Sequence, residues 1–158
     1  MQKEKLQDFT LRVTQSNRSE LVVVIYEIIQ TYLAEGKEAF AAGDIPEYKK
    51  CLKKAQQFVC ELMEALDFQY EISYQLASLY IYANKMLIRA DMKKDPSLLE
   101  GVEIVINGLH KSFAEVAKQD KSAPVMGNTQ QVYEGFTYGR DSMNAVFQDG
   151  SGNRGFTV

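Results

Sequence analysis

Residues 44–66 read DIPEYKKCLKKAQQFVCELMEAL, and this stretch decides the fold. Its apolar residues recur at alternating steps of three and four, the spacing of one buried helix face in a bundle. They are Ile45, Tyr48, Leu52, Ala55, Val59, Leu62 and Leu66. Asp44 and Glu47 stand in the relation of a capping box, and Pro46 lies in the first turn. The stretch therefore predicts a long helix with one side against a core.

The same rhythm on either side predicts three more helices. Asn17 and Glu20 form a second capping pair at the start of the first helix, and Gly43 is a typical stop at its end. The last helix starts at Asp95, because an N-cap residue followed by proline is a strong start signal. The predicted limits of the three are residues 17–43, about 71–92 and 95–119.

Short connections join these helices, so consecutive helices should lie side by side and antiparallel. We therefore expect an all-α fold, an up-down-up-down four-helix bundle over residues 17–119, preceded by an N-terminal arm at 1–16. Residues 120–158 lack a helical stripe and are rich in glycine, which predicts an irregular C-terminal tail. Because this tail is also rich in aromatics, part of it is expected to dock on the bundle. These aromatics are Tyr133, Phe136, Tyr138, Phe147 and Phe156.

Charge and composition argue against several partners. The net charge of -3 and the pI of about 5.3 give no electrostatic reason for binding nucleic acid. The N-terminal sequence has no apolar signal region, and the longest apolar run, residues 21–26, is too short to insert into a membrane. Cys51 and Cys60 are too far apart along one helix for a disulfide. We expect a cytoplasmic protein with reduced thiols.

The inventory of reactive residues predicts no catalytic site. A di-iron bundle needs paired Glu-x-x-His motifs, whereas this chain has one histidine, His110, with Asn107 three residues before it. No phosphate-binding glycine motif is present. We therefore expect no metal, no cofactor and no enzyme activity. His110 is expected at the boundary of the core, because it follows the apolar position Leu109.

Two predicted helices carry more apolar surface than one bundle seam needs. The first has two adjacent stripes, and the third has apolar residues outside its seam. Both helices could be the most buried ones of the bundle. The alternative is an apolar groove that accepts an amphipathic segment of another chain. The predicted groove residues are Val22, Tyr26, Ile29, Leu33, Tyr74, Tyr80, Ile81 and Ile88.

A series of short motifs resembles the flagellar secretion chaperone family, in order and spacing, over residues 9–117. Residues 17–27 resemble the family's S-P-E-E-L…L-Y-D/E start, and residues 65–67 resemble its S-L-D. Residues 79–90 resemble its L-Y-x-Y…R-L-x-x-A helix, and residues 93–95 match the K-K-D before its last helix. Each motif alone is weak, but the ordered series is more specific.

The resemblance implies a cytoplasmic export chaperone that binds the disordered C-terminal segment of flagellin and prevents premature polymerisation before secretion. The family often begins with an N-P-Y segment that folds over the groove. This chain lacks that segment, and Phe9 is the nearby aromatic that would take the place of the cap. Arg18 and Ile28 also depart from the family pattern, where proline and glycine stand. The alternative is a regulatory or scaffold bundle that binds another flagellar export protein or its own tail.

Overall fold

The computed structural model describes residues 1–126, which form five α-helices and one short 3-10 helix, with no strand among them. The elements are α1 Lys3–Gln15, α2 Arg18–Ala41, α3 Ile45–Glu64, α4 Glu71–Lys93, η1 Pro96–Leu98 and α5 Leu99–Gln119. The predicted all-α antiparallel bundle is confirmed. The part of the predicted tail from residue 127 onward, with all five of its aromatics, lies outside the described residues.

The capping residues set the helix boundaries as their sequence positions predict. The Asn17 side chain accepts a hydrogen bond from the backbone N–H of Glu20 at 2.9 Å, which begins α2. Asp44 accepts from the N–H of Glu47 at 3.1 Å and begins α3. Gly43 between them has a φ of +79°, a left-handed conformation that glycine adopts without strain.

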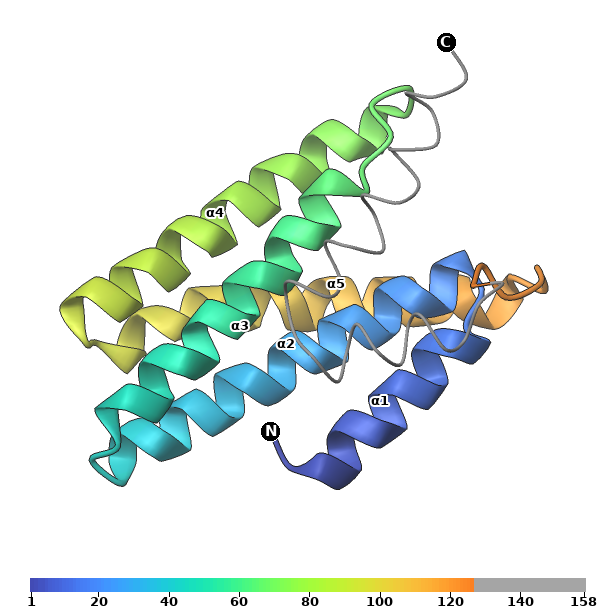
Figure 1. The fold of residues 1–158 in the computed structure, drawn as a ribbon. Coiled ribbons are helices and arrows are strands. Elements are labelled where there is room, and N and C mark those ends of the chain that lie inside the picture. The colour runs from blue at the N-terminus through green and yellow to red at the C-terminus, as the bar shows by residue number, and fades with distance from the viewer. Residues whose placement is uncertain (127–158) are drawn as a thin grey trace, which may run out of the picture.

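Four helices form the bundle. Helix α2 packs against both α3 and α5, and α4 completes the ring by packing against α3 and α5. The α3–α4 hairpin crosses the α2–α5 pair at an angle, as Figure 1 shows. Each helix turns one apolar face inward, and the largest fully buried side chains include Tyr26, Tyr48, Tyr80, Ile29, Leu52, Leu87 and Ile106.

The N-terminal segment is a helix, whereas the sequence analysis predicted an arm. Helix α1 lies beside α2, with which it forms a hairpin (Figure 1). Phe9 and Val13 point into the hydrophobic cluster of the bundle and are buried. The terminal ammonium of Met1 pairs with Glu35 of α2 at 2.9 Å. The helix therefore forms because its apolar face packs against the bundle, chiefly at α2.

Residues 120–126 return from α5 to the junction between α1 and α2. Ser19 donates from its hydroxyl to Asp120 Oδ2 at 2.6 Å, and Asn17 Nδ2 donates to the Asp120 carbonyl at 3.1 Å. The backbone N–H of Val125 donates to the Ser16 carbonyl at 3.1 Å. Met126 packs against the hydrophobic core. The last described residues are thus held at the end of the bundle where α2 begins.

Candidate partner-binding surface

The predicted groove residues on α2 face the interior of the bundle. Tyr26, Ile29 and Leu33 are buried, and Val22 is half-buried. The Tyr26 ring lies 5.8 Å from the ring of Phe113 on α5, centroid to centroid. This stripe of α2 therefore packs between the other helices and leaves almost no surface for a partner.

Tyr80 of α4 belongs to the same interior group. Its hydroxyl lies 2.5 Å from the Tyr26 hydroxyl, and both side chains are buried. Burial raises the pKa of each phenol, so both hydroxyls stay protonated in the folded protein. The two neutral hydroxyls are hydrogen-bonded to each other and buried, so they are not available to a binding partner.

The remaining predicted residues lie on the outer side of α4 and are exposed. Tyr74 is 61% exposed, Ile81 58% and Ile88 40%. Residues seven apart on a helix differ by only about 20° in direction, so the three form one row along α4. Tyr70, at the N-terminus of the helix, extends the row and is 65% exposed. We call Tyr70, Tyr74, Ile81 and Ile88 the outer stripe.

An aromatic contact marks the N-terminal end of the outer stripe. The ring of Phe68, in the α3–α4 loop, lies 5.0 Å from the ring of Tyr74, centroid to centroid. Both rings are largely exposed, although aromatic side chains gain most from burial. An exposed apolar surface of this extent commonly marks an interaction site.

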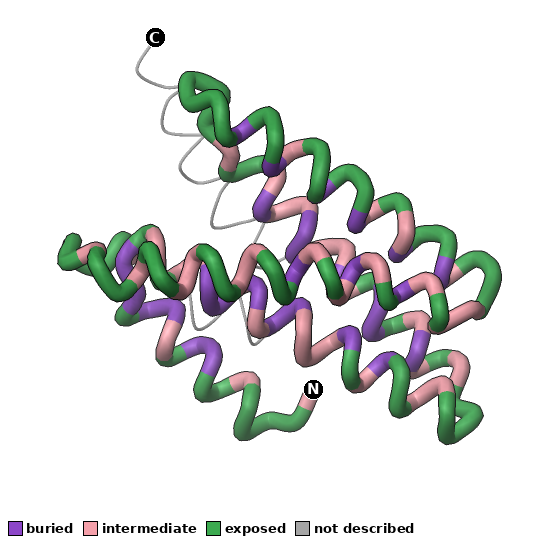
Figure 2. The backbone as a smooth tube through the Cα atoms, turned by 180° about the vertical axis from the view of Figure 1, so that it is seen from behind, coloured by how far each residue is buried: buried purple, intermediate pink, exposed green. Residues whose placement is uncertain are grey.

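The arrangement of the helices explains why α4 is open and α2 is not. Helix α2 has α1 along its third side, whereas the main neighbours of α4 among the described elements are α3, α5 and η1, with the Tyr80–Tyr26 contact to α2 inside the bundle. Figure 2 shows α4 as a largely exposed helix whose buried residues recur along one side. The apolar surplus that the sequence placed on both helices is therefore covered on α2 and uncovered on α4.

Helix α1 is held to the bundle by an ion-pair network that sequence inspection did not detect. Arg12 Nη1 donates to Glu27 Oε2 at 2.5 Å, and His110 Nε2 of α5 lies 3.1 Å from Glu27 Oε1. Burial raises the pKa of Glu27, but the hydrogen bonds with Arg12 and His110 outweigh it and hold the pKa below its usual value. Glu27 thus joins α1, α2 and α5.

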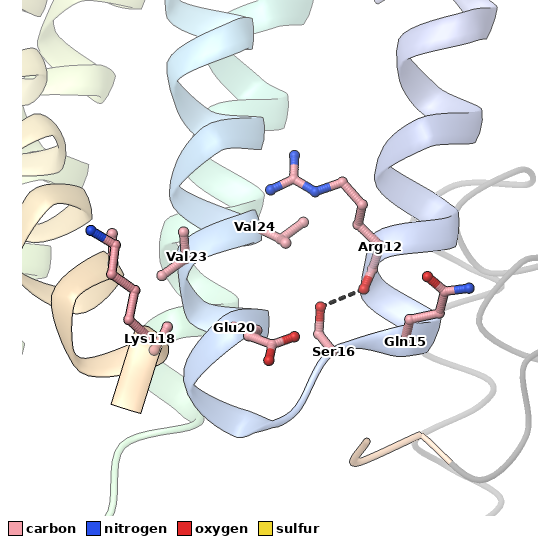
Figure 3. A pocket seen from close by; sticks show the side chains of 9 residues that line it. Arg12, Gln15, Ser16, Glu20, Val23, Val24 and Lys118 are labelled. Atoms are coloured by element: carbon pink, nitrogen blue, oxygen red, sulfur yellow. Dashed lines mark hydrogen bonds between the residues drawn. The ribbon is translucent and has the colours of Figure 1, made fainter. Parts of the chain in front are cut away.

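A small cleft of about 340 Å³ opens next to this network. In Figure 3, Val23 and Val24 of α2 lie between Arg12 of α1 and Lys118 of α5. Glu20 and Gln15 complete its polar rim. The cleft suits a single side chain rather than a helix. Its residues come from three helices, so no local sequence pattern could have revealed it.

Residues 1–126 also bear on metal binding and membrane insertion. Within this part of the chain, no group of three or more His, Cys, Asp or Glu side chains could hold a metal ion. Over the same residues, no helix combines the length and the apolar content that crossing a bilayer requires.

Comparison with known proteins agrees with this picture of a binding protein. The family model "Flagellar protein FliS" matches residues 1–120. The "Flagellar secretion chaperone FliS" of Bacillus subtilis (strain 168) is 22% identical over 109 residues, which cover 69% of this chain and 82% of the relative. The chain belongs to the FliS family of flagellar secretion chaperones, which are binding proteins and not enzymes.

Proposed function

We propose that this chaperone binds the C-terminal segment of flagellin in the cytoplasm and prevents its polymerisation before secretion. The observation that carries the proposal is the outer stripe of α4, an apolar row with Tyr74, Ile81 and Ile88 largely exposed. An amphipathic segment that folds on binding can lay its apolar face along such a row. Binding then stabilises the unassembled subunit by mass action.

The buried members of the predicted groove support this surface from behind. Tyr80 lies on the inner face of α4 and meets Tyr26 of α2, while Ile29 and Leu33 fill the same interior. These side chains fix the position of α4 but do not contact the guest. Val22 is half-buried and likewise belongs to the supporting group. A rigid α4 keeps the entropic cost of binding low on the chaperone side.

Phe9 takes the part of a cap, as a member of α1. Its ring is 8% exposed and packs into the hydrophobic cluster. Together with Val13 it covers apolar surface of the bundle at α2, so that α4 is left as the open side for the flagellin segment. Removing the Phe9 ring should therefore loosen α1 without changing the outer stripe.

The test is calorimetric titration of the full chain with a peptide of the flagellin C-terminal segment. We expect binding, and a loss of affinity of about 10-fold or more in Ile81→Glu or Ile88→Glu, because burial of either isoleucine by the guest is worth about 1.5–3 kcal/mol. The matched control is Ile104→Glu on α5, which is 67% exposed and lies outside the outer stripe. This control should bind as the unchanged chain does.

Two results would contradict the proposal. One is the absence of both heat and a shift in melting temperature at high peptide concentration. The other is an equal loss of affinity in Ile104→Glu and Ile81→Glu, which would place the binding elsewhere. If the chain binds the terminal segment of another flagellar export protein but not that of flagellin, the proposed binding surface is retained and the proposed client is wrong.

A further inference from the structure

The outer stripe of α4 exposes a row of large apolar side chains to solvent when no client is bound. It begins at Tyr70 and continues through Tyr74 and Ile81 to Ile88, all of them at least 40% exposed. Phe68, 49% exposed, adjoins its first turn through the ring contact with Tyr74. A surface of this kind promotes association unless something covers it.

We infer that residues 127–158 of the same chain fold back over the outer stripe and cover it when no client is bound. This inference concerns the client-free chain and does not depend on which client the chaperone carries. Three observations support it: the place from which this segment leaves the bundle, its length, and its composition.

The first observation is the point of departure. Residues 120–126 are fixed to the start of α2 by the Asp120–Ser19 and Val125–Ser16 hydrogen bonds. In an antiparallel bundle, α2 and α4 begin at the same end. Figures 1 and 2 both show the α3–α4 loop on the same side of the molecule as the end of α5. The segment therefore starts from the end at which Tyr70 and Tyr74 begin the outer stripe.

The second observation is length. Helix α4 has 23 residues, and a helix of that size is about 35 Å long at ~1.5 Å per residue. Residues 127–158, at about 3.3 Å each when extended, can reach roughly 100 Å. The segment is thus long enough to cross the end of the bundle and follow α4 to Ile88.

The third observation is composition. The segment carries aromatic side chains at intervals, Tyr133, Phe136, Tyr138, Phe147 and Phe156, which is more apolar surface than a plain linker needs. Its six glycines allow the backbone to approach a helix closely. It also lies beyond residues 1–120, the part that the family model matches.

Charge favours this occupant over a second copy of the chain. The exposed side of α4 carries Lys85, Arg89 and Lys93. In a symmetric dimer that pairs the two α4 helices in parallel, these cations would face those of the other copy. Residues 127–158 instead bring a small excess of acidic side chains, namely Glu134, Asp141 and Asp149 against Arg140 and Arg154.

Photo-cross-linking of the full chain tests the inference without any client. Ile81→benzoylphenylalanine places an apolar photoreactive group in the stripe, and Ile104→benzoylphenylalanine on α5 is the matched control. We expect the monomer of the Ile81 variant to yield cross-linked peptides that contain residues 127–158, and the control to yield none. Absence of these peptides overturns the inference. A dimer band that grows with concentration in their place also overturns it and assigns the stripe to a second copy.

A second measurement uses the full chain with its five C-terminal aromatics changed to serine. Fluorescence of an apolar dye should rise several-fold in this variant, and Ile81→Glu in the same background should remove most of the rise. Unchanged fluorescence overturns the inference. Because no flagellin peptide is present in either experiment, cross-linking can succeed where the flagellin titration fails, and the two proposals stand or fall separately.

Discussion

The hydroxyl of Tyr26 on α2 and the hydroxyl of Tyr80 on α4 lie 2.5 Å apart inside the bundle. They join two helices that are diagonal neighbours in the ring. Each supplies the other's partner, and the described residues contain no buried side-chain polar atom without a hydrogen bond. The pair therefore fixes the position of α4 along α2, and because both hydroxyls are hydrogen-bonded, burying them costs little free energy.

Removing one hydroxyl of this pair should destabilise the protein more than removing both. Tyr80→Phe leaves the Tyr26 hydroxyl buried without its partner, which costs about 1–3 kcal/mol of unfolding free energy. The double variant Tyr26→Phe with Tyr80→Phe leaves no unpaired group and should recover part of that loss. Denaturant unfolding of all four forms gives the coupling energy. Strictly additive losses would show that the two hydroxyls do not interact.

Loss of the Glu27 charge should release α1 selectively. Glu27→Gln weakens the partly exposed ion pair with Arg12, worth at most about 1 kcal/mol, and the hydrogen bond with His110. Hydrogen exchange should accelerate in α1 and remain unchanged in α3. Glu103→Gln, which breaks the Lys37–Glu103 pair between α2 and α5, is the matched control and should leave α1 unaffected.

The same carboxylate predicts a pH dependence for the attachment of α1. The pKa of Glu27 is lower in the folded than in the unfolded chain. Its contribution is therefore fully present above the ordinary glutamate pKa of about 4.3 and is lost as the pH falls through the lower folded value. The stability difference between the unchanged chain and Glu27→Gln should shrink in acid. A difference that grows in acid would contradict this assignment.

Acid should also weaken the contact between residues 120–126 and the start of α2, which the hydrogen bonds of Asp120 and Val125 form. Hydrogen bonds from Ser122 and Ser19 lower the pKa of Asp120 to about 2. The ionised Asp120 carboxylate stabilises the contact fully above the ordinary aspartate pKa of about 3.9. This stabilisation is lost as the pH falls through about 2, where the carboxylate becomes protonated. The NMR signal of the Val125 amide should shift over this interval. Asp120→Asn should abolish the shift, and a shift that persists would place its origin elsewhere.

Two glycines should respond in opposite directions to alanine. A Cβ at Gly36 would lie 3.1 Å from Leu52 Cδ1 and 3.3 Å from Cys51 Cβ, so Gly36→Ala forces α2 and α3 apart and should cost about 1–3 kcal/mol. A Cβ at Gly108 meets nothing within 4 Å, so Gly108→Ala should stabilise α5 by up to about 1 kcal/mol through helix propensity. Thermal unfolding measures both changes, and equal signs would refute the packing argument.

Helix α1 shows where the sequence analysis fell short. Leu6, Phe9 and Val13 have the three-and-four spacing of a helix face, but they follow a strongly polar start and amount to fewer than three turns. A short helix with one apolar face is marginal alone and depends on its neighbour for stability. The formation of α1 therefore depends on the apolar surface of the bundle at α2 that is available to pack against it.

The sequence by itself determined the four long helices and their antiparallel order, because capping residues and apolar spacing act locally. It placed the start of the last helix at Asp95, whereas Pro96–Leu98 form a 3-10 helix and α5 begins at Leu99. Only the tertiary structure decided that both apolar stripes of α2 are covered, because the neighbours that pack against a helix are not set by its own sequence. It also decided that Tyr26 and Tyr80 meet inside while Tyr74 and Ile81 face solvent. Whether an apolar side chain is core or surface depends on how many helices surround its own.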